Sequence, residues 1–325
     1  GPDKEFSFSD VYAPLDFGAV RFCDARVWAG FNKVAKGMDK YTDYVMGRIE
    51  KDKHGFGSNR IPLWIKPDKK LSVNDVMDMM RDHFEGSPMD MNTDAGAGPF
   101  ALPYRWRPLT FELDGVEYCN ERAISTQQTG FSFVTQSRGY LPDPIGGIIW
   151  FGVDDTYSTC YVPIYCGINH TPEPFAVGNG DLLTYSETSA FWLFNKVSNF
   201  TYLRYNSMIK HVVEVQQELE KGFVEMVPAI DQAALKFWNE GKKEKAIEVL
   251  NNYSAQATHQ TMARWNVLLN YLLVKYIDGN IKKEINGQFE RTETGMPASP
   301  SQPGYPERWK RSVVNDTGTK LKVIE

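Results

Sequence analysis

The sequence predicts an α+β fold, and three observations support this. Residues 24–86 carry apolar side chains at helical spacing, and residues 189–279 repeat that pattern over longer stretches. Between them, residues 87–186 contain short apolar or alternating runs separated by Gly and Pro, which is typical of strands. We therefore expect a sheet flanked by helices, with an added helical block toward the C-terminus.

Three helices are predicted in the first part of the chain. Residues 24–38 and 39–51 each place their apolar side chains on one stripe. The third pattern spans residues 71–86, where Ser72 is a suitable N-cap and Gly86 stands at the expected C-terminal stop. We therefore expect the third helix to fill the whole stretch between these two residues.

The middle of the chain is predicted to be sheet. Residues 112–118 indicate a hairpin, because Asp114 and Gly115 favour a two-residue turn between strands. Residues 146–153 are apolar without alternation, which favours a strand covered on both faces. The expected strands are 109–113, 130–136, 146–153 and 159–166.

After residue 186 the pattern is mostly helical. Residues 292–311 are rich in Pro, Gly and Ser and are expected to be extended over the surface. The expected helices are one or two within 189–223, one within 229–241 that follows Pro228, and two within 243–279.

Composition restricts the classes of function. Apolar residues make up 42% of the 325 residues and charged residues 24%, as in globular proteins. The formal net charge of −5 argues against nucleic acid or an anionic membrane as the main partner. No run approaches the length of about 20 apolar residues that a membrane-spanning helix requires. We therefore expect neither nucleic acid nor a membrane as a partner.

The four cysteines lack the spacing of a zinc site, because the sequence has no C-x-x-C motif and no paired Cys/His cluster. We expect Cys23, Cys119, Cys160 and Cys166 to be buried small apolar side chains. No nucleophile elbow is present either, since Ser132 lies within a predicted strand and lacks the G-x-S-x-G turn.

Residues 81–90 form the densest polar cluster. Asp82, His83, Glu85 and Asp90 are residue types that bind hard cations or zinc. However, the first three are too close together in sequence to share one helical face, and zinc motifs on helices need i, i+4 spacing. We interpret the cluster as a helix end and expect no metal site, with a metal-dependent hydrolase as an alternative.

Several long segments resemble a known family. They are LSVNDVMDMMRDHFEGSPMD (71–90), YCNERAISTQQTGFSFVTQSRGYLPDPIGGIIWFGVDD (118–155), YVPIYCGINHTPEPF (161–175) and SAFWLFNKVSNFTYLRYNSMIKHVVEVQQELE (189–220). Together they are similar, in order and in register over roughly residues 5–310, to the cysteine dipeptidase family that includes dipeptidase A and is related to secernins.

The resemblance implies an N-terminal nucleophile hydrolase with an αββα sandwich, in which two antiparallel sheets pack between helical layers. It implies hydrolysis of short peptides by a cysteine that becomes the first residue of the mature chain, without a cofactor. The cysteine thiolate attacks the scissile carbonyl, and its own α-amino group can accept the proton because the pKa of such an amine is about 8.

The nucleophile is expected to lie in polypeptide that precedes Gly1. The chain begins in a segment that is similar to the middle of the family's pattern, and Cys23, within VRFCDARVW, does not match the nucleophile's place. None of the four cysteines inherits the catalytic role. The expected partners are therefore short peptides and the N-terminal portion of the same gene product. A homo-oligomer and either a cytoplasmic or an exported location are compatible with the sequence.

The resemblance also implies residues that bind substrate. Arg138 precedes the LPD turn, where it would hold a peptide carboxylate or stabilise an oxyanion. Asn169 and His170, in the turn after the next strand, are further candidates.

The alternative to a dipeptidase is a non-catalytic peptide-binding fragment or paralogue. The expected parts are 1–186 with helices and antiparallel sheet of the hydrolase domain, 187–280 with a helical block on the sheet, and 281–325 with an extended tail.

Overall fold

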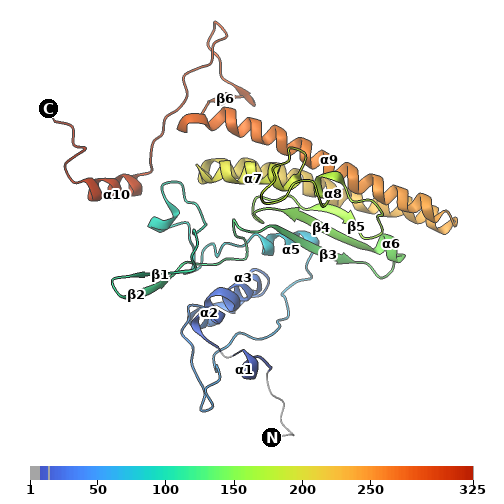
Figure 1. Cartoon of the computed structure of the whole chain (residues 1–325), viewed down its shortest axis with the longest axis horizontal. Coiled ribbons are helices and arrows are strands. Elements are labelled where there is room, and N and C mark those ends of the chain that lie inside the picture. The colour runs from blue at the N-terminus through green and yellow to red at the C-terminus, as the bar shows by residue number, and fades with distance from the viewer. Residues whose placement is uncertain (1–7, 14, 325) are drawn as a thin grey trace. The chain divides into compact units, whose positions relative to one another are not determined.

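The computed structural model describes residues 8–13 and 15–324. The chain divides into two compact units, one made of residues 1–93 and 103–127 and the other of residues 94–102 and 128–325. We call them the N-terminal and the C-terminal unit. Both helices and strands are present, which confirms the predicted α+β class (Figure 1). The predicted boundaries near residues 186 and 280 stay a prediction.

The N-terminal unit is mainly helical. A continuous helical segment begins with α2 (Phe17–Ala19), passes through a π-helical turn (Val20–Asp24) and continues as α3 (Ala25–Val34). The unit also contains α1 (Phe8–Tyr12), a 3-10 turn (Met38–Tyr41), α4 (Thr42–Val45) and α5 (Val73–Met80). The predicted helix over 39–51 is therefore wrong in length, because only its first two turns are helical.

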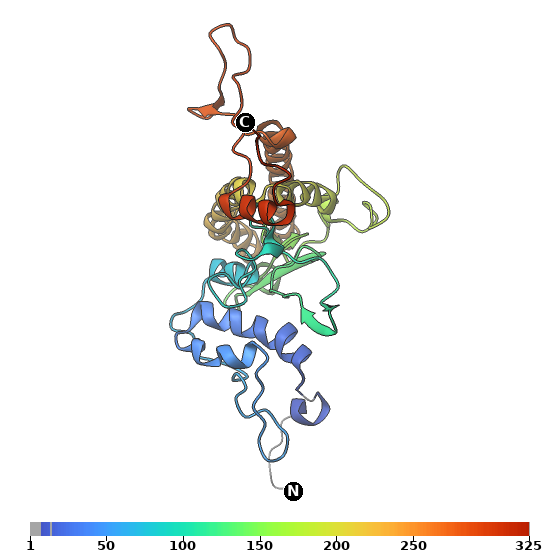
Figure 2. The ribbon, with the colours of Figure 1, turned by 90° about the vertical axis from the view of Figure 1, so that its left-hand side faces the viewer.

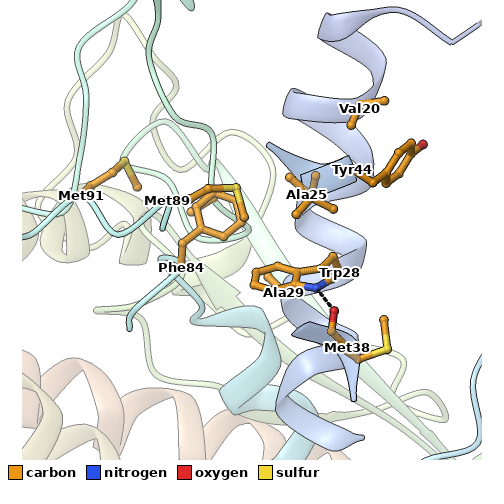
Figure 3. Close-up of a cluster of buried hydrophobic side chains, with 11 residues drawn as sticks. Val20, Ala25, Trp28, Ala29, Met38, Tyr44, Phe84, Met89 and Met91 are labelled. Atoms are coloured by element: carbon orange, nitrogen blue, oxygen red, sulfur yellow. Dashed lines mark hydrogen bonds between the residues drawn. The ribbon is translucent and has the colours of Figure 1, made fainter. Parts of the chain in front are cut away.

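The core of this unit forms around one face of α3. Figure 3 shows Trp28 and Ala29 of that helix near Phe84 and Met89, and all four side chains are buried. The indole Nε1 of Trp28 donates a hydrogen bond of 2.7 Å to the carbonyl of Met38, so the polar group of this large ring is satisfied inside the core. Of the stripe predicted on 24–38, Trp28 is buried and Phe31 and Val34 are half-buried, but the inclusion of Val27 is wrong, because its side chain is exposed.

Helix α5 begins as predicted and ends earlier. Ser72 Oγ accepts from the backbone N–H of Asp75, and the Asp75 carboxylate accepts from the backbone N–H of Ser72, which together form a capping box. The predicted end at Gly86 is wrong, because the helix stops at Met80. Beyond it, Asp82 and Glu85 side chains accept bonds from backbone N–H groups and thereby replace helical bonds.

The predicted hairpin is confirmed. Strands β1 (Thr110–Leu113) and β2 (Val116–Cys119) pair antiparallel, with Thr110 opposite Cys119. Asp114 and Gly115 have φ values of 52° and 77°, the left-handed conformation that the tight two-residue turn requires.

The C-terminal unit contains a three-stranded antiparallel sheet in the order β3-β4-β5. The strands are β3 (Phe131–Ser137), β4 (Gly147–Val153) and β5 (Val162–Tyr165), with the short helix α6 (Asp143–Gly146) between the first two. All three coincide with predicted strands, and β5 is shorter than expected.

Three helices cover one face of this sheet. They are α7 (Ala190–Tyr202), α8 (Tyr205–Asn239) and α9 (Lys243–Tyr276), and α8 and α9 run side by side along the strands (Figures 1 and 2). Carboxylate and hydroxyl groups of the helices join them to the sheet, since Tyr161 N donates to Glu220 and Tyr165 N donates to Ser254. Trp150, at the centre of β4, is fully buried beneath them.

Two predicted helix boundaries are wrong, and packing explains both. Helix α8 runs through Pro228, although proline removes one helical bond and costs about 3 kcal/mol. Pro228 is exposed, while Phe223 and Val227 beside it are buried, so the apolar stripe outweighs the missing bond. Helix α9 is also one helix rather than two, with an unbroken buried stripe at Tyr253, Ala257, Thr261, Trp265, Leu268 and Leu272.

The remaining residues form small elements. A second hairpin consists of β6 (Glu284–Ile285) and β7 (Gln288–Phe289), and helix α10 spans Glu307–Thr317. The prediction of an extended segment is therefore wrong from residue 307 onward. The other short 3-10 turns are Ala95–Ala97, Glu173–Phe175 and Ile277–Gly279. Among the described residues, no helix combines the length and apolar character needed to cross a membrane.

Candidate functional site

One face of the β3-β4-β5 sheet is exposed along β3, whereas Val153 and Val162 on the same face are buried. Side chains alternate between the faces of a strand, so Phe131 and Phe133 of β3 share a face with their partners Val153 and Phe151 of β4. Phe131 is 61% exposed and Phe133 is 48% exposed. We call this surface the open sheet face. It is the reverse of the face that α7, α8 and α9 cover.

A cavity of about 360 Å³ opens at one end of this face. Its walls are aromatic: the rings of Phe131 and Phe151 are stacked at 6.0 Å, and Phe175 meets Phe151 edge-on at 5.2 Å. Phe191 and Trp192, at the start of α7, complete the wall. A cavity of this kind binds apolar groups such as the side chain of a large residue in a peptide.

Polar groups stand at the rim of the aromatic cavity. Asn179 is held in place, because its Nδ2 donates to the carbonyl and the carboxylate of Glu173. Asp181 accepts from the backbone N–H of Leu183, and this bond and one from Thr184 lower the pKa of Asp181. Asp181 is therefore ionised at neutral pH and can attract the ammonium group of a ligand.

Arg138 lies at the opposite end of the sheet, beside a hollow of about 230 Å³. Its side chain is buried and forms an ion pair with Asp231 of α8. It also donates to the carbonyls of Ile145, at 2.7 Å, and Gly146, at 3.3 Å. These contacts orient the guanidinium group firmly. Whether it contacts a substrate stays a prediction.

The ring of Tyr165 links Arg138 to helix α8. The guanidinium carbon of Arg138 lies 5.8 Å from the ring centroid, and the Tyr165 hydroxyl donates a bond of 2.7 Å to Asp231. Burial, together with the charge and hydrogen bond of Asp231, raises the pKa of Tyr165, so its hydroxyl stays protonated. Asp231 thus holds two side chains at this end of the sheet.

Asn169 and His170 are exposed and lie beyond the end of β5. The Asn169 side chain accepts a bond of 2.6 Å from Asn251 of α9 and contacts His170 Nδ1 at 2.5 Å. Because the strands are antiparallel, the end of β5 lies at the same end of the sheet as Arg138. The three predicted residues therefore share one end of the sheet, and the aromatic cavity lies at the other.

A buried pair of carboxyl groups follows β4. Asp154 is 2% exposed and accepts a bond of 2.5 Å from Ser198 of α7. Asp155 accepts from the hydroxyl of Tyr202 at 3.0 Å. Burial first, and the neighbouring Asp155 charge second, raise the pKa of Asp154 to about 7, against the weaker effect of the Ser198 bond. The pair ties the sheet to α7 and is closed to substrate.

The polar side chains of the cluster at 81–90 bond to one another and to neighbouring segments of the N-terminal unit. His83 bonds to Glu85 and to the hydroxyl of Tyr104, and Asp82 pairs with Lys33. Burial alone would raise the pKa of Glu85. The hydrogen bonds and the charge of His83 outweigh burial and lower this pKa to about 2. Across the described residues, no group of three or more His, Cys, Asp or Glu side chains is arranged to hold a metal ion.

The expectation of four buried cysteines is wrong for two of them. Cys160 is buried and Cys119 is half-buried, but Cys23 and Cys166 are exposed. All four belong to the described residues, and none forms a disulfide. The reason is local: Cys23 lies on the outer side of the π-helical turn, and Cys166 follows the last residue of β5. Neither the aromatic cavity nor the hollow beside Arg138 is lined by a cysteine.

Comparison with known proteins identifies the family. The family model described as peptidase family C69 matches residues 1–218, about two thirds of the chain. The protein is therefore a member of a peptidase family, and its fold is α+β. The chain belongs to peptidase family C69, which confirms the family predicted from the sequence.

A curated relative agrees with this assignment. The chain is similar to a protein of Latilactobacillus sakei named "Probable dipeptidase", with 24% identity over 183 residues. The match covers 54% of this chain and 33% of the relative, so the chain spans about a third of that protein's length.

Sequence reasoning missed the aromatic cavity. Its lining comes from separate segments that contain Phe131, Phe151, Phe175 and Phe191, and no local pattern connects them. The signal available in the sequence is the alternation at GFSFV, which places two phenylalanines on the face opposite Ser132 and Val134. That alternation predicts an aromatic strand face, although it does not tell which face is open.

Proposed function

We propose that the chain is the C-terminal portion of a cysteine dipeptidase, which hydrolyses short peptides through a cysteine in polypeptide upstream of Gly1. Membership of peptidase family C69 and similarity to a probable dipeptidase support this proposal. The observation that carries it is the open sheet face, whose exposed Phe131 and Phe133 form an apolar surface beside an aromatic cavity. Large exposed apolar patches mark surfaces that bind a partner or a ligand.

In this proposal, the open sheet face packs on a second sheet supplied by the upstream polypeptide, and the two sheets form an αββα sandwich. Helices α7, α8 and α9 supply one outer layer. The reaction is an amide hydrolysis. The upstream cysteine thiolate forms a bond to the scissile carbonyl carbon, the protonated amine leaves, and water then releases the acyl group from sulfur.

The residues of this chain contribute binding. The aromatic cavity accepts an apolar side chain, and the ionised Asp181 attracts the peptide's ammonium group. Arg138, Asn169 and His170 are the alternative substrate-binding residues at the other end of the sheet, because a dipeptide of about 7 Å is too short to contact both ends of the seven-residue strand β3, which spans about 23 Å. In this arrangement Asp231 acts as a positioning residue for Arg138.

Peptide hydrolysis tests the catalytic part of the proposal. We expect the full-length gene product to cleave dipeptides, and iodoacetamide or replacement of the upstream cysteine by alanine to abolish the cleavage. We expect this chain alone to be inactive. Thiol-dependent turnover by this chain alone would show that the nucleophile lies within it. Tight dipeptide binding without cleavage by the full-length product would identify a peptide-binding protein instead.

A surface substitution tests the sandwich. Phe133→Lys places a charge on the open sheet face, and Tyr140→Lys is its control, because Tyr140 is exposed outside the strands. In this chain alone, we expect both variants to unfold within about 0.5 kcal/mol of the parent. In the full-length product, we expect Phe133→Lys alone to be destabilised by about 3 kcal/mol, since it buries an unpaired charge. Equal stability of the two full-length variants would contradict the sandwich.

A further inference from the structure

The aromatic cavity has room for one large side chain. Its volume of about 360 Å³ is near the lower end of the range of about 300–1,000 Å³ for ligand pockets. Its rings surround a guest from several sides, since Phe175 stands at 84° to Phe151 and Trp192 stands at 75° to Phe191. A ligand therefore places one ring or one long aliphatic group in it, and the rest of the ligand stays at the rim.

The loop that carries the polar rim lies directly against the aromatic wall. The indole Nε1 of Trp192 donates a hydrogen bond of 3.0 Å to the carbonyl of Thr184. Gly180 has a φ of 80°, and a Cβ atom there would lie 2.8 Å from the Thr184 carbonyl oxygen and 3.3 Å from Trp192 Nε1. This close approach requires glycine. Asp181, the next residue, is therefore held beside the rings, and both belong to the wall of one cavity.

The negative charge of Asp181 is available to a ligand. Its carboxylate accepts a hydrogen bond of 2.7 Å from the backbone N–H of Leu183, and it takes part in none of the ion pairs among the described residues. Asn179, its neighbour on the rim, is fully used, because its Nδ2 donates to Glu173 and its Oδ1 accepts from Ser186. Asp181 thus gives the rim a charge that attracts a cation.

Only one residue of a dipeptide satisfies both features of the cavity. The N-terminal residue carries its ammonium group and its side chain on the same Cα atom, so the side chain can enter the cavity while the ammonium group faces Asp181. The C-terminal residue carries a carboxylate on its Cα atom instead. If its side chain entered the cavity, two negative charges would face each other, which is unfavourable.

We propose that the cavity selects dipeptides whose N-terminal residue is large and apolar and has a free amino group, with the side chain among the rings and the ammonium group at Asp181. This inference rests on the proposed function, because it names the substrate class of the same site. The C-terminal side chain stays outside the cavity and contributes less to selectivity.

The two contacts differ in strength. Burial of a whole phenylalanine side chain strengthens binding by about 10- to 100-fold. Asp181 is exposed, and an exposed ion pair strengthens binding by at most about fivefold. The size of the N-terminal side chain therefore decides the order of substrates, and the ammonium group decides which end of the peptide enters.

Two dipeptides of identical composition test the inference. They are phenylalanyl-alanine and alanyl-phenylalanine, and N-acetyl-phenylalanyl-alanine is the third probe, which lacks the ammonium group. Binding of each to this chain is measured by isothermal titration calorimetry. Turnover of the first two by the full-length gene product is measured as kcat/KM.

Two matched glycine substitutions tell the ends of the sheet apart. Gly130 belongs to the cavity wall, and a Cβ atom there meets nothing within 4 Å, so Gly130→Leu narrows the cavity without a clash. Gly139→Leu makes the same change in the hollow beside Arg138, where a Cβ atom also meets nothing within 4 Å. Asp181→Asn removes the charge at the rim and keeps the shape of the side chain.

We expect phenylalanyl-alanine to bind this chain at least tenfold more tightly than alanyl-phenylalanine. Gly130→Leu should weaken its binding at least tenfold, and Gly139→Leu should leave it unchanged. Asp181→Asn should weaken the free dipeptide about fivefold and the acetylated one not at all, because only the free dipeptide has the partner charge. The full-length product should show the same preference in kcat/KM.

The inference is overturned if the two dipeptides bind equally, if neither binds this chain, or if Gly139→Leu weakens binding and Gly130→Leu does not. It is also overturned if this chain prefers phenylalanyl-alanine but the full-length product cleaves both dipeptides equally, since upstream polypeptide would then fill the cavity. Failure of the proposed function looks different: this chain binds phenylalanyl-alanine selectively, and the full-length product cleaves no dipeptide.

Discussion

Replacing Asp154 by asparagine should remove a pH dependence of stability. Asp154 is buried behind β4 with a pKa of about 7, and its carboxyl group has a usual value of 3.8. Because the folded-state pKa is raised, its contribution to stability is fully present below pH 4 and is lost as the pH rises through 7. A difference of about 3 pKa units corresponds to about 4 kcal/mol.

Asparagine is a suitable probe at this position. It stays neutral at every pH, its side-chain oxygen can accept the Ser198 hydrogen bond, and it tolerates the left-handed φ of 67° found at residue 154. At pH 4, we therefore expect Asp154→Asn and the parent to have similar free energies of unfolding. At pH 8, the variant should be more stable by up to about 4 kcal/mol.

Urea unfolding from pH 4 to pH 8, followed by circular dichroism, measures this difference. His211, whose pKa is lowered first by burial and then by Lys275, is present in both proteins, so its contribution cancels in the comparison. Asp155→Asn is the second variant, and it should move the transition to lower pH, because the Asp155 charge helps to raise the pKa of Asp154. A difference between parent and Asp154→Asn that stays constant within 1 kcal/mol would refute the reasoning.

Three further substitutions test packing and capping, each measured by urea unfolding. Trp28→Ala should lower the free energy of unfolding by about 3–5 kcal/mol, and a loss below 1 kcal/mol would mean that the core closes without the indole. Asp231→Ala should cost about 3–5 kcal/mol, because it leaves Arg138 charged and buried; an effect as small as that of Asp43→Ala, at an exposed pair, would contradict this. Ser72→Ala should cost about 1 kcal/mol through loss of the α5 cap, whereas Ser72→Gly should cost only a few tenths.

The sequence predicts best the features that depend on neighbouring residues. The Asp114–Gly115 turn and the Ser72 cap are set by backbone conformation and by one side chain, and both are confirmed. The strands of the C-terminal unit are also predictable, since β-rich apolar runs between Gly and Pro have few other conformations.

Helix ends are less predictable, because tertiary packing competes with local signals. Pro228 is a strong helix-starting signal, but the stripe formed by Phe223 and Val227 continues through it. Helix α5, in contrast, ends at Met80, before the apolar pattern ends. Beyond it, the carboxylates of Asp82 and Glu85 accept hydrogen bonds from backbone N–H groups. Local propensity thus loses to packing in one case and to side-chain hydrogen bonds in the other.

Sites formed by distant segments depend on the register of the strands. The hairpin turn at Asp114–Gly115 is visible in the sequence, and counting outward from it pairs Thr110 with Cys119, as observed. The aromatic cavity cannot be found in this way, because Phe175 and Phe191 reach it from segments outside the sheet.

The faces of β3 are reversed relative to an ordinary half-buried strand. The buried face carries Ser132 and Val134, and the exposed face carries Phe131 and Phe133. A strand stabilised only by its own unit would bury the phenylalanines, since each buries far more apolar surface than serine. The buried hydroxyl of Ser132 instead forms a hydrogen bond of 3.0 Å with the hydroxyl of Tyr161, so this polar group is satisfied on the buried face. The exposed phenylalanines of β3 are therefore the physical argument for our proposal that a second sheet packs against this face.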